Sequence, residues 1–137
     1  DVDRIMKHPK TMIASDGKLS QMGVKHPHPR SYGTFPRVLG YYVRDHGLLT
    51  LAEAIHKMTG MPAHLLGLKE RGHIATNMNA DLVLFDPKTV TDNATFNAPH
   101  QYPSGIPYVI VNGVLIIEKG ELTQNRTGKL LLKSSQK

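Results

Sequence analysis

The sequence contains no cysteine among its 137 residues. This absence excludes disulfide bonds, thiolate metal ligands and a cysteine nucleophile. It also fits a reducing compartment, so we expect a cytoplasmic protein. The sequence lacks any run of about 18 apolar residues, the length that a membrane-spanning helix needs, and we expect no membrane partner. The chain begins with Asp1 rather than methionine, which leads us to expect a processed product or a fragment.

Positive charge is in excess, with a formal net charge of +6. A basic domain binds nucleic acid when its lysines and arginines gather in one patch. Here they are scattered, except near the end of the chain, where the cluster comprises Arg126, Lys129, Lys133 and Lys137. We interpret that cluster as a solvated terminus and expect no nucleic-acid partner. The sequence also has no phosphate-binding loop, nucleophile elbow or dinucleotide fingerprint.

The beginning of the chain predicts a strand, a long loop and a helix. Thr11 to Ala14 form a short apolar run that ends in a turn sequence, which is typical of a buried strand. The residues from Gly17 to Pro36 are rich in Gly, Pro, His and Ser and predict a loop. Loops of that length in compact domains are functional or disordered. Apolar residues at helical spacing predict a helix from Arg37 to His46, ended by Gly47.

Two more helices are expected before residue 67. Thr50 and Glu53 have the spacing of a capping box, so we expect a helix to begin there and to end at Gly60. Pro62 fits the first position of a short helix that Gly67 ends. The strand before these helices has no visible partner strand. Because a lone strand leaves its backbone groups unpaired, the chain is expected to be part of something larger.

Beyond residue 67 the sequence predicts β structure. Residues 80–87 form an apolar strand followed by a turn, and residues 108–117 form a hairpin around Asn112-Gly113, the preferred pair for a type I′ turn. Between them, residues 89–107 predict a polar loop, and the tail from about Thr123 is expected to fray. We therefore divide the chain into two parts, residues 1–67 and residues 68–137, in the α/β class.

Several motifs resemble the N-acyl-D-amino-acid deacylases (D-aminoacylases) of the metal-dependent amidohydrolase superfamily. The narrow ones are Ser15-Asp16-Gly17, His28-Pro29-Arg30 and Gly33-Thr34-Phe35-Pro36-Arg37. The strand Ala80-Asp81-Leu82-Val83 and the hairpin Val111-Asn112-Gly113 are shared more widely and indicate only the superfamily. Where the family has a glycine before this strand, the chain has Asn77, which tolerates a left-handed backbone.

The resemblance implies a C-terminal fragment of an amidohydrolase. Its fold would be the last strand and helices of a (β/α)8 barrel in residues 1–67, with part of a small β-sandwich domain in residues 68–137. The parent enzyme would hold zinc through histidines and a cysteine on earlier strands, and no segment of this chain matches them. Its small-molecule substrate would be an N-acyl-D-amino acid, hydrolysed to a carboxylate and a free D-amino acid.

Two residues carry the chemistry that this resemblance implies. Asp16, at the end of the expected last barrel strand, would take a proton from the metal-bound water and pass it to the leaving amine. Arg30 would bind the substrate carboxylate through two parallel hydrogen bonds. Without the resemblance, a plain turn is the favoured interpretation of the Ser-Asp-Gly run, and Arg30 is an exposed loop arginine.

The remaining candidates are His28 and Tyr32, which are expected either to touch substrate or to hold the loop. The chain has eight histidines, but His26 and His28 have no third ligand at useful spacing, so an independent metal site is not expected. As an isolated chain we expect the protein to be catalytically silent. The alternative function is a non-catalytic structural or interaction module, which self-associates or is covered by a partner. In the parent enzyme, the remainder of the barrel would be the partner of this part.

Overall fold

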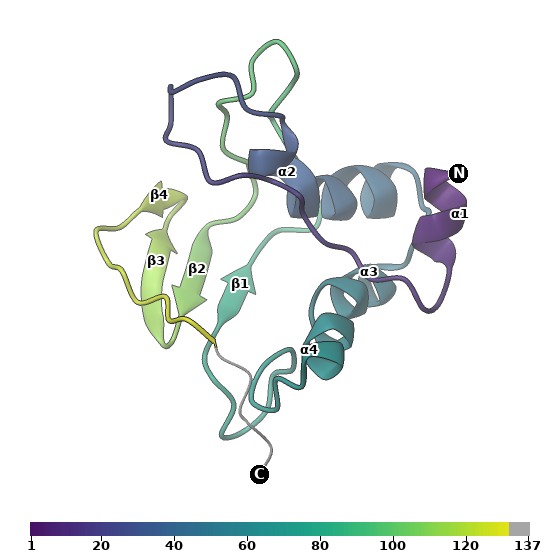
Figure 1. Cartoon of the computed structure of the whole chain (residues 1–137), viewed down its shortest axis with the longest axis vertical. Coiled ribbons are helices and arrows are strands. Elements are labelled where there is room, and N and C mark those ends of the chain that lie inside the picture. Colours follow the sequence, from purple (N-terminus) through teal and green to yellow (C-terminus); the bar gives the residue numbers. More distant parts are fainter. Residues whose placement is uncertain (132–137) are drawn as a thin grey trace.

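A computed structural model describes residues 1–131 and has its helices in the first half of the chain and its sheet in the second. The helices are α1 (Val2–Lys7), α2 (Arg30–Arg37), η1 (Val38–Asp45), α3 (Leu51–Met58) and α4 (Gly60–Leu66). The strands are β1 (Leu82–Leu84), β2 (Tyr108–Val111), β3 (Val114–Glu118) and β4 (Glu121–Leu122). Figure 1 shows the sheet on one side of the molecule and the helices on the other. The chain thus combines helices with a sheet, as predicted, but the helices and the antiparallel strands lie in separate halves instead of alternating as in a typical α/β fold.

The start of α3 confirms the predicted capping box. The Glu53 N–H donates to the Thr50 hydroxyl at 3.2 Å, and the Thr50 N–H donates to the Glu53 carboxylate at 2.8 Å. Helix α3 ends at Met58, and α4 follows at once from Gly60, two residues earlier than expected. Gly67 ends α4 with a φ of +71°, as predicted. The core cluster joins η1 to α3 and consists of Val38 of η1, Leu49 of the turn before α3, and Ala54 of α3.

The helix expected from Arg37 begins earlier, at Arg30, so the predicted loop ends at Pro29. Helix α2 runs through Pro36 and continues without a break into η1, a π-helix. Both prolines were expected in the loop, Pro29 within it and Pro36 at its end. Pro29 instead precedes the first helical residue, where a missing N–H costs nothing, and Pro36 is buried within the helix. Arg30 and Tyr32 therefore lie on a helix, not in a loop.

The buried strand predicted for Thr11 to Ala14 is not formed within residues 1–131. Among residues 1–131, no strand includes this segment or pairs with it. Two of its hydrogen bonds involve one residue of α3: the Ile13 N–H donates to the Lys57 carbonyl at 3.1 Å, and Lys57 Nζ donates to the Thr11 carbonyl at 2.9 Å. The apolar run was recognised correctly, but a strand exists only where a neighbouring strand accepts its hydrogen bonds. The short helix α1 was not predicted.

The second half forms one antiparallel sheet with the order β1-β2-β3-β4. The predicted hairpin is confirmed, with φ of +50° at Asn112 and +79° at Gly113. Asp81 lies at the edge of β1, where it accepts a hydrogen bond from the Asn112 N–H at 2.7 Å and pairs with Arg71. Asn77 adopts a φ of +67°, as its place before the strand predicted. The fourth strand was not predicted.

The segment between β1 and β2 is a long loop, as expected, but it is packed against the helices. Val90 is fully buried, and Thr91 pairs with Ser104 across the loop. In Figure 1 the upper part of this green loop lies beside the dark blue segment that precedes α2. No helix within the described residues is long and apolar enough to span a bilayer. Of the basic terminal cluster, Lys133 and Lys137 lie outside the described residues.

Candidate functional site

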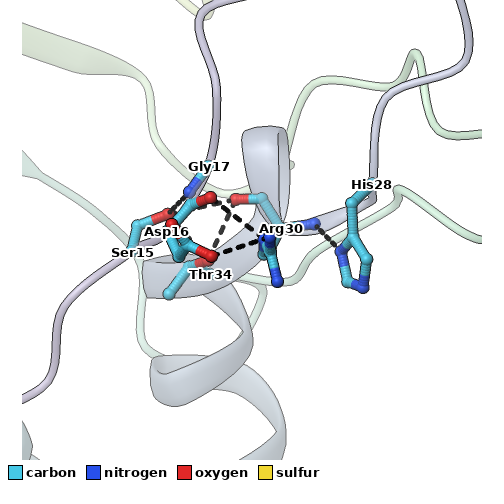
Figure 2. A network of polar contacts seen from close by, with 6 residues as sticks. All are labelled: Ser15, Asp16, Gly17, His28, Arg30 and Thr34. Atoms are coloured by element: carbon cyan, nitrogen blue, oxygen red, sulfur yellow. Dashed lines mark hydrogen bonds and ion pairs between the residues drawn. The ribbon is translucent and has the colours of Figure 1, made fainter.

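Asp16 and Arg30, the two main sequence candidates, are in direct contact. Arg30 Nη2 lies 2.8 Å from Asp16 Oδ2, and the Arg30 Nε–H donates to the Asp16 carbonyl at 3.0 Å (Figure 2). Arg30 is the first residue of α2, and Asp16 approaches from the extended segment before it. The Asp16 side chain is 89% exposed and that of Arg30 44%. The structure thus places a proton-carrying group and an anion-binding group together at an accessible surface.

A compact turn holds Asp16 against α2. The Ser15 hydroxyl accepts a hydrogen bond from the Gly17 N–H at 3.1 Å and lies 3.1 Å from the Thr34 hydroxyl (Figure 2). Thr34 in turn donates to the Arg30 carbonyl at 2.9 Å. Neither Ser15 nor Thr34 was predicted as a site residue. The presence of Ser15 in the quoted motif was the available signal, whereas the contact of Thr34 depends on α2 beginning at Arg30.

His28 shapes the start of α2. Its Nδ1 accepts a hydrogen bond from the Arg30 N–H at 3.0 Å, and its ring packs edge-on against Phe96, with 4.9 Å between the ring centres. Because a backbone N–H can only donate, Nδ1 is the unprotonated nitrogen and the neutral ring carries its proton on Nε2. Of the two roles expected for His28, the contacts favour the structural one, which orients Arg30.

Tyr32 contacts the loop after β1. Its hydroxyl lies 3.0 Å from His100 Nδ1, and its ring packs edge-on against Tyr102. His100 also bonds the preceding segment, since its Nε2 lies 2.9 Å from the Lys25 carbonyl. These contacts favour the loop-anchoring role for Tyr32 over substrate contact. His100 had no informative pattern in the sequence, because its partners are distant along the chain.

A cavity of about 550 Å³ lies between α2 and the loop after β1. Polar residues that line it include His28, Arg30, Arg37 and Asp92, and the apolar lining includes Ile13, Val38 and Phe96. Arg37 Nη1 lies 3.1 Å from Asp92 Oδ2. Burial lowers the pKa of Arg37, but the hydrogen bond and charge of Asp92 outweigh it, so the pKa is raised above its ordinary value. The cavity is therefore lined by two cations and one carboxylate.

Residues 1–131 offer no set of three or more His, Asp or Glu side chains that could hold a metal ion. His26 and His28 do not converge on a common point with a third ligand; His26 Nε2 instead lies 2.7 Å from the Phe96 carbonyl. A metal needs three or four converging ligands, so the described residues do not fit one. The chemistry available here is proton transfer and anion binding.

Comparison with known proteins supports the family resemblance that the motifs indicate. The model of the amidohydrolase family matches residues 1–117. An N-acyl-D-aspartate deacylase of Alcaligenes xylosoxydans xylosoxydans is 49% identical over 131 residues, covering 96% of this chain and 26% of the relative. A D-aminoacylase of the same organism is 45% identical over 135 residues, covering 98% of this chain and 27% of the relative. The chain thus spans about a quarter of the length of these relatives.

Solved structures give the same relationship. The crystal structure of a D-aminoacylase described as defining a novel subset of amidohydrolases matches with a TM-score of 0.83 and 48% identity, over 90% of this chain and 26% of that one. An N-acyl-D-glutamate deacylase from Bordetella bronchiseptica, complexed with zinc and a phosphonate mimic of the tetrahedral intermediate, matches with a TM-score of 0.78 and 45% identity, over 84% of this chain and 24% of that one. The resemblance to D-aminoacylases is confirmed, and the chain belongs to the amidohydrolase family.

Proposed function

We propose that this chain is the part of an N-acyl-D-amino-acid deacylase that carries its proton-transferring carboxylate, Asp16, and its substrate anchor, Arg30. The observation that carries the proposal is their contact of 2.8 Å at the start of α2. Similarity to three deacylases that differ in the named amino acid supports the reaction, the hydrolysis of an N-acyl-D-amino acid. The shared element of those substrates is the amide next to a carboxylate.

We further propose the place of the chain in that enzyme. Residues 1–67 would supply the last strand and helices of a (β/α)8 barrel, and residues 68–137 would supply part of a small β-sandwich. The segment 11–14 supports this placement, because it is extended, apolar and unpaired by any strand within residues 1–131. A neighbouring strand from the rest of a barrel would accept its hydrogen bonds and complete it as a strand.

Arg30 recognises the substrate by exchanging one carboxylate for another. Its guanidinium presents paired N–H groups that match a carboxylate, and in this structure it holds that of Asp16. Exposed ion pairs of this kind contribute only about 1 kcal/mol or less, so the α-carboxylate of a substrate can replace Asp16 at little cost. The exchange leaves Asp16 next to the bound substrate and free to accept a proton.

Asp16 then serves as general base and general acid. Its carboxylate accepts a proton from the water that attacks the amide carbon and donates that proton to the amine as the C–N bond breaks. The Bordetella relative contains zinc. Since residues 1–131 contain no ligand set, a metal in the complete enzyme is held by residues from elsewhere, and the substrate meets the two groups at the edge of the cavity.

A chimeric enzyme tests this proposal. The segment of the Alcaligenes D-aminoacylase that this chain matches would be replaced by the 137-residue chain, and hydrolysis of an N-acyl-D-amino acid would be measured. We expect activity, and we expect Arg30→Gln to raise KM about 10- to 100-fold, because a hydrogen bond to a charged group is worth roughly 1.5–3 kcal/mol. The same variant should leave hydrolysis of the substrate's primary amide unchanged.

Arg126→Gln is the matched control, because within residues 1–131 Arg126 donates hydrogen bonds only to carbonyls of its own loop, those of Thr123 and Asn125. It should behave as the unmodified chimera. A folded chimera that hydrolyses no N-acyl-D-amino acid would contradict the proposed reaction. An unchanged KM in the Arg30→Gln variant would contradict the role of Arg30.

A further inference from the structure

Glycine and arginine residues alternate along one face of the continuous helix formed by α2 and η1. Gly33, Arg37, Gly40 and Arg44 follow one another at intervals of four, three and four residues, which places them along one side of a helix. All four contact the same short segment of the loop after β1, residues 90–92. The two halves of the chain are therefore joined along this helix face.

The glycines allow the segment to approach the helix closely. A Cβ at Gly33 would lie 2.8 Å from Asp92 Cβ, and a Cβ at Gly40 would lie 2.6 Å from the Val90 carbonyl oxygen. Real Cβ atoms essentially never come that close to another atom. Val90, between these contacts, is fully buried. Because glycine has no side chain, Gly33 and Gly40 leave the room that residues 90–92 need to lie directly against the helix.

The arginines then fix the segment by polar contacts. Arg37 Nη1 lies 3.1 Å from Asp92 Oδ2, and Arg44 Nη1 donates to the Val90 carbonyl at 2.5 Å. The Asp92 side chain is only 13% exposed, whereas that of Asp16 is 89% exposed. Ion pairs that are shielded from water interact more strongly than exposed ones. Asp92 is thus the more firmly held of the two carboxylates that pair with α2.

We propose that residues 90–92 position Arg30 by holding α2, and that Asp92 is a positioning residue for recognition of the substrate carboxylate. This inference rests on the proposed function of Arg30. Asp92 pairs with Arg37 near the end of the helix whose first residue is Arg30, and all three side chains line the same cavity. When the Asp92 contact is lost, α2 is free to shift, and Arg30 leaves the place where the substrate carboxylate binds.

The test is a double-mutant cycle in the chimeric deacylase. Asp92→Asn removes the charge with little change of shape, and we expect it to raise KM about 3- to 10-fold while kcat stays within about threefold. Because Asp92 acts through Arg30, Asp92→Asn in an Arg30→Gln background should raise KM no further. Asp3→Asn is the control, since Asp3 forms an exposed pair with His46 beyond the far end of η1. KM effects that multiply, or a fall in kcat alone, would overturn the proposal.

A second measurement needs no activity. Amide hydrogen exchange of α2 in the folded chimera should become at least tenfold faster in Asp92→Asn, while exchange in α4 stays the same. Unchanged exchange in α2 would overturn the positioning role. An inactive but folded chimera would contradict the proposed reaction alone, because the exchange experiment still decides whether residues 90–92 hold the helix.

Discussion

Gly17 occupies a position where a side chain has no room. A Cβ there would lie 2.8 Å from Ser31 Cα and 3.0 Å from the Arg30 carbonyl oxygen. The φ of Gly17 is not positive, so the position needs glycine because the chain passes close to α2, and not because of an unusual backbone angle. At the scale of single residues, this close approach is what lets Asp16 reach Arg30.

Replacing Gly17 with alanine should therefore destabilise the protein. Forcing one extra methyl group against backbone atoms costs typically about 1–3 kcal/mol, and we expect Gly17→Ala to lower the free energy of unfolding by that amount in urea titrations. Gly128→Ala is the matched control, because no atom of the described part of the chain lies within 4 Å of a Cβ at Gly128. If both variants unfold at the same urea concentration, the turn is not tightly packed on α2.

Single residues also show which contacts a sequence can reveal. Asp16 and Arg30 are separated by 14 residues and lie in recognisable motifs, so both were predicted. The contacts that hold α2 span longer separations, 55 residues from Arg37 to Asp92 and 68 from Tyr32 to His100. No local pattern marks either distant partner, because each becomes a neighbour of α2 only after the loop following β1 folds back on the helix.

Among the elements, α3 has the clearest link between a local motif and stability. Hydrogen bonds from the Thr50 hydroxyl and the Thr50 N–H hold the pKa of Glu53 below its ordinary value of 4.5. A carboxyl whose pKa is lowered on folding stabilises the folded state above its unfolded pKa. That contribution is lost as the pH falls through the lower, folded pKa.

Glu53→Gln should therefore lower stability most at neutral pH, with a difference from the unmodified protein that shrinks as the pH falls below about 4. Urea unfolding measured between pH 7 and pH 3 checks this. Thr50→Ala removes the hydroxyl but keeps the Thr50 N–H that donates to the Glu53 carboxylate, so it should lose only part of the pH-dependent contribution, together with about 1 kcal/mol for the cap itself. A difference that stays constant over this pH range would contradict the role of the Glu53 carboxylate.

Elements were predicted well where their signals are local. The capping box of α3 and the Asn112-Gly113 hairpin depend on residues within one turn of each other, and both are confirmed. The predicted strand at 11–14 and the predicted loop to Pro36 failed because both depend on distant partners. The first lacks a strand beside it within residues 1–131, and the helix through Pro36 packs on residues 90–92.

At the scale of the whole molecule, the two halves of the chain contribute different parts of the proposed site. The helical half carries Asp16 and Arg30, and the loop that leads into the sheet packs along α2 and lines the cavity. The chain spans about a quarter of the relatives it matches, and its described residues contain no metal-ligand set. We therefore expect the 137-residue chain alone to hydrolyse no N-acyl-D-amino acid.

The most direct measurement of the central claim is kcat of the chimeric deacylase with Asp16→Asn. Asparagine keeps the size of the side chain but cannot carry the proton, so we predict a fall in kcat of about 10²- to 10⁴-fold with the protein still folded. A kcat equal to that of the unmodified chimera would contradict the account, and Asp16 would then be only part of a turn.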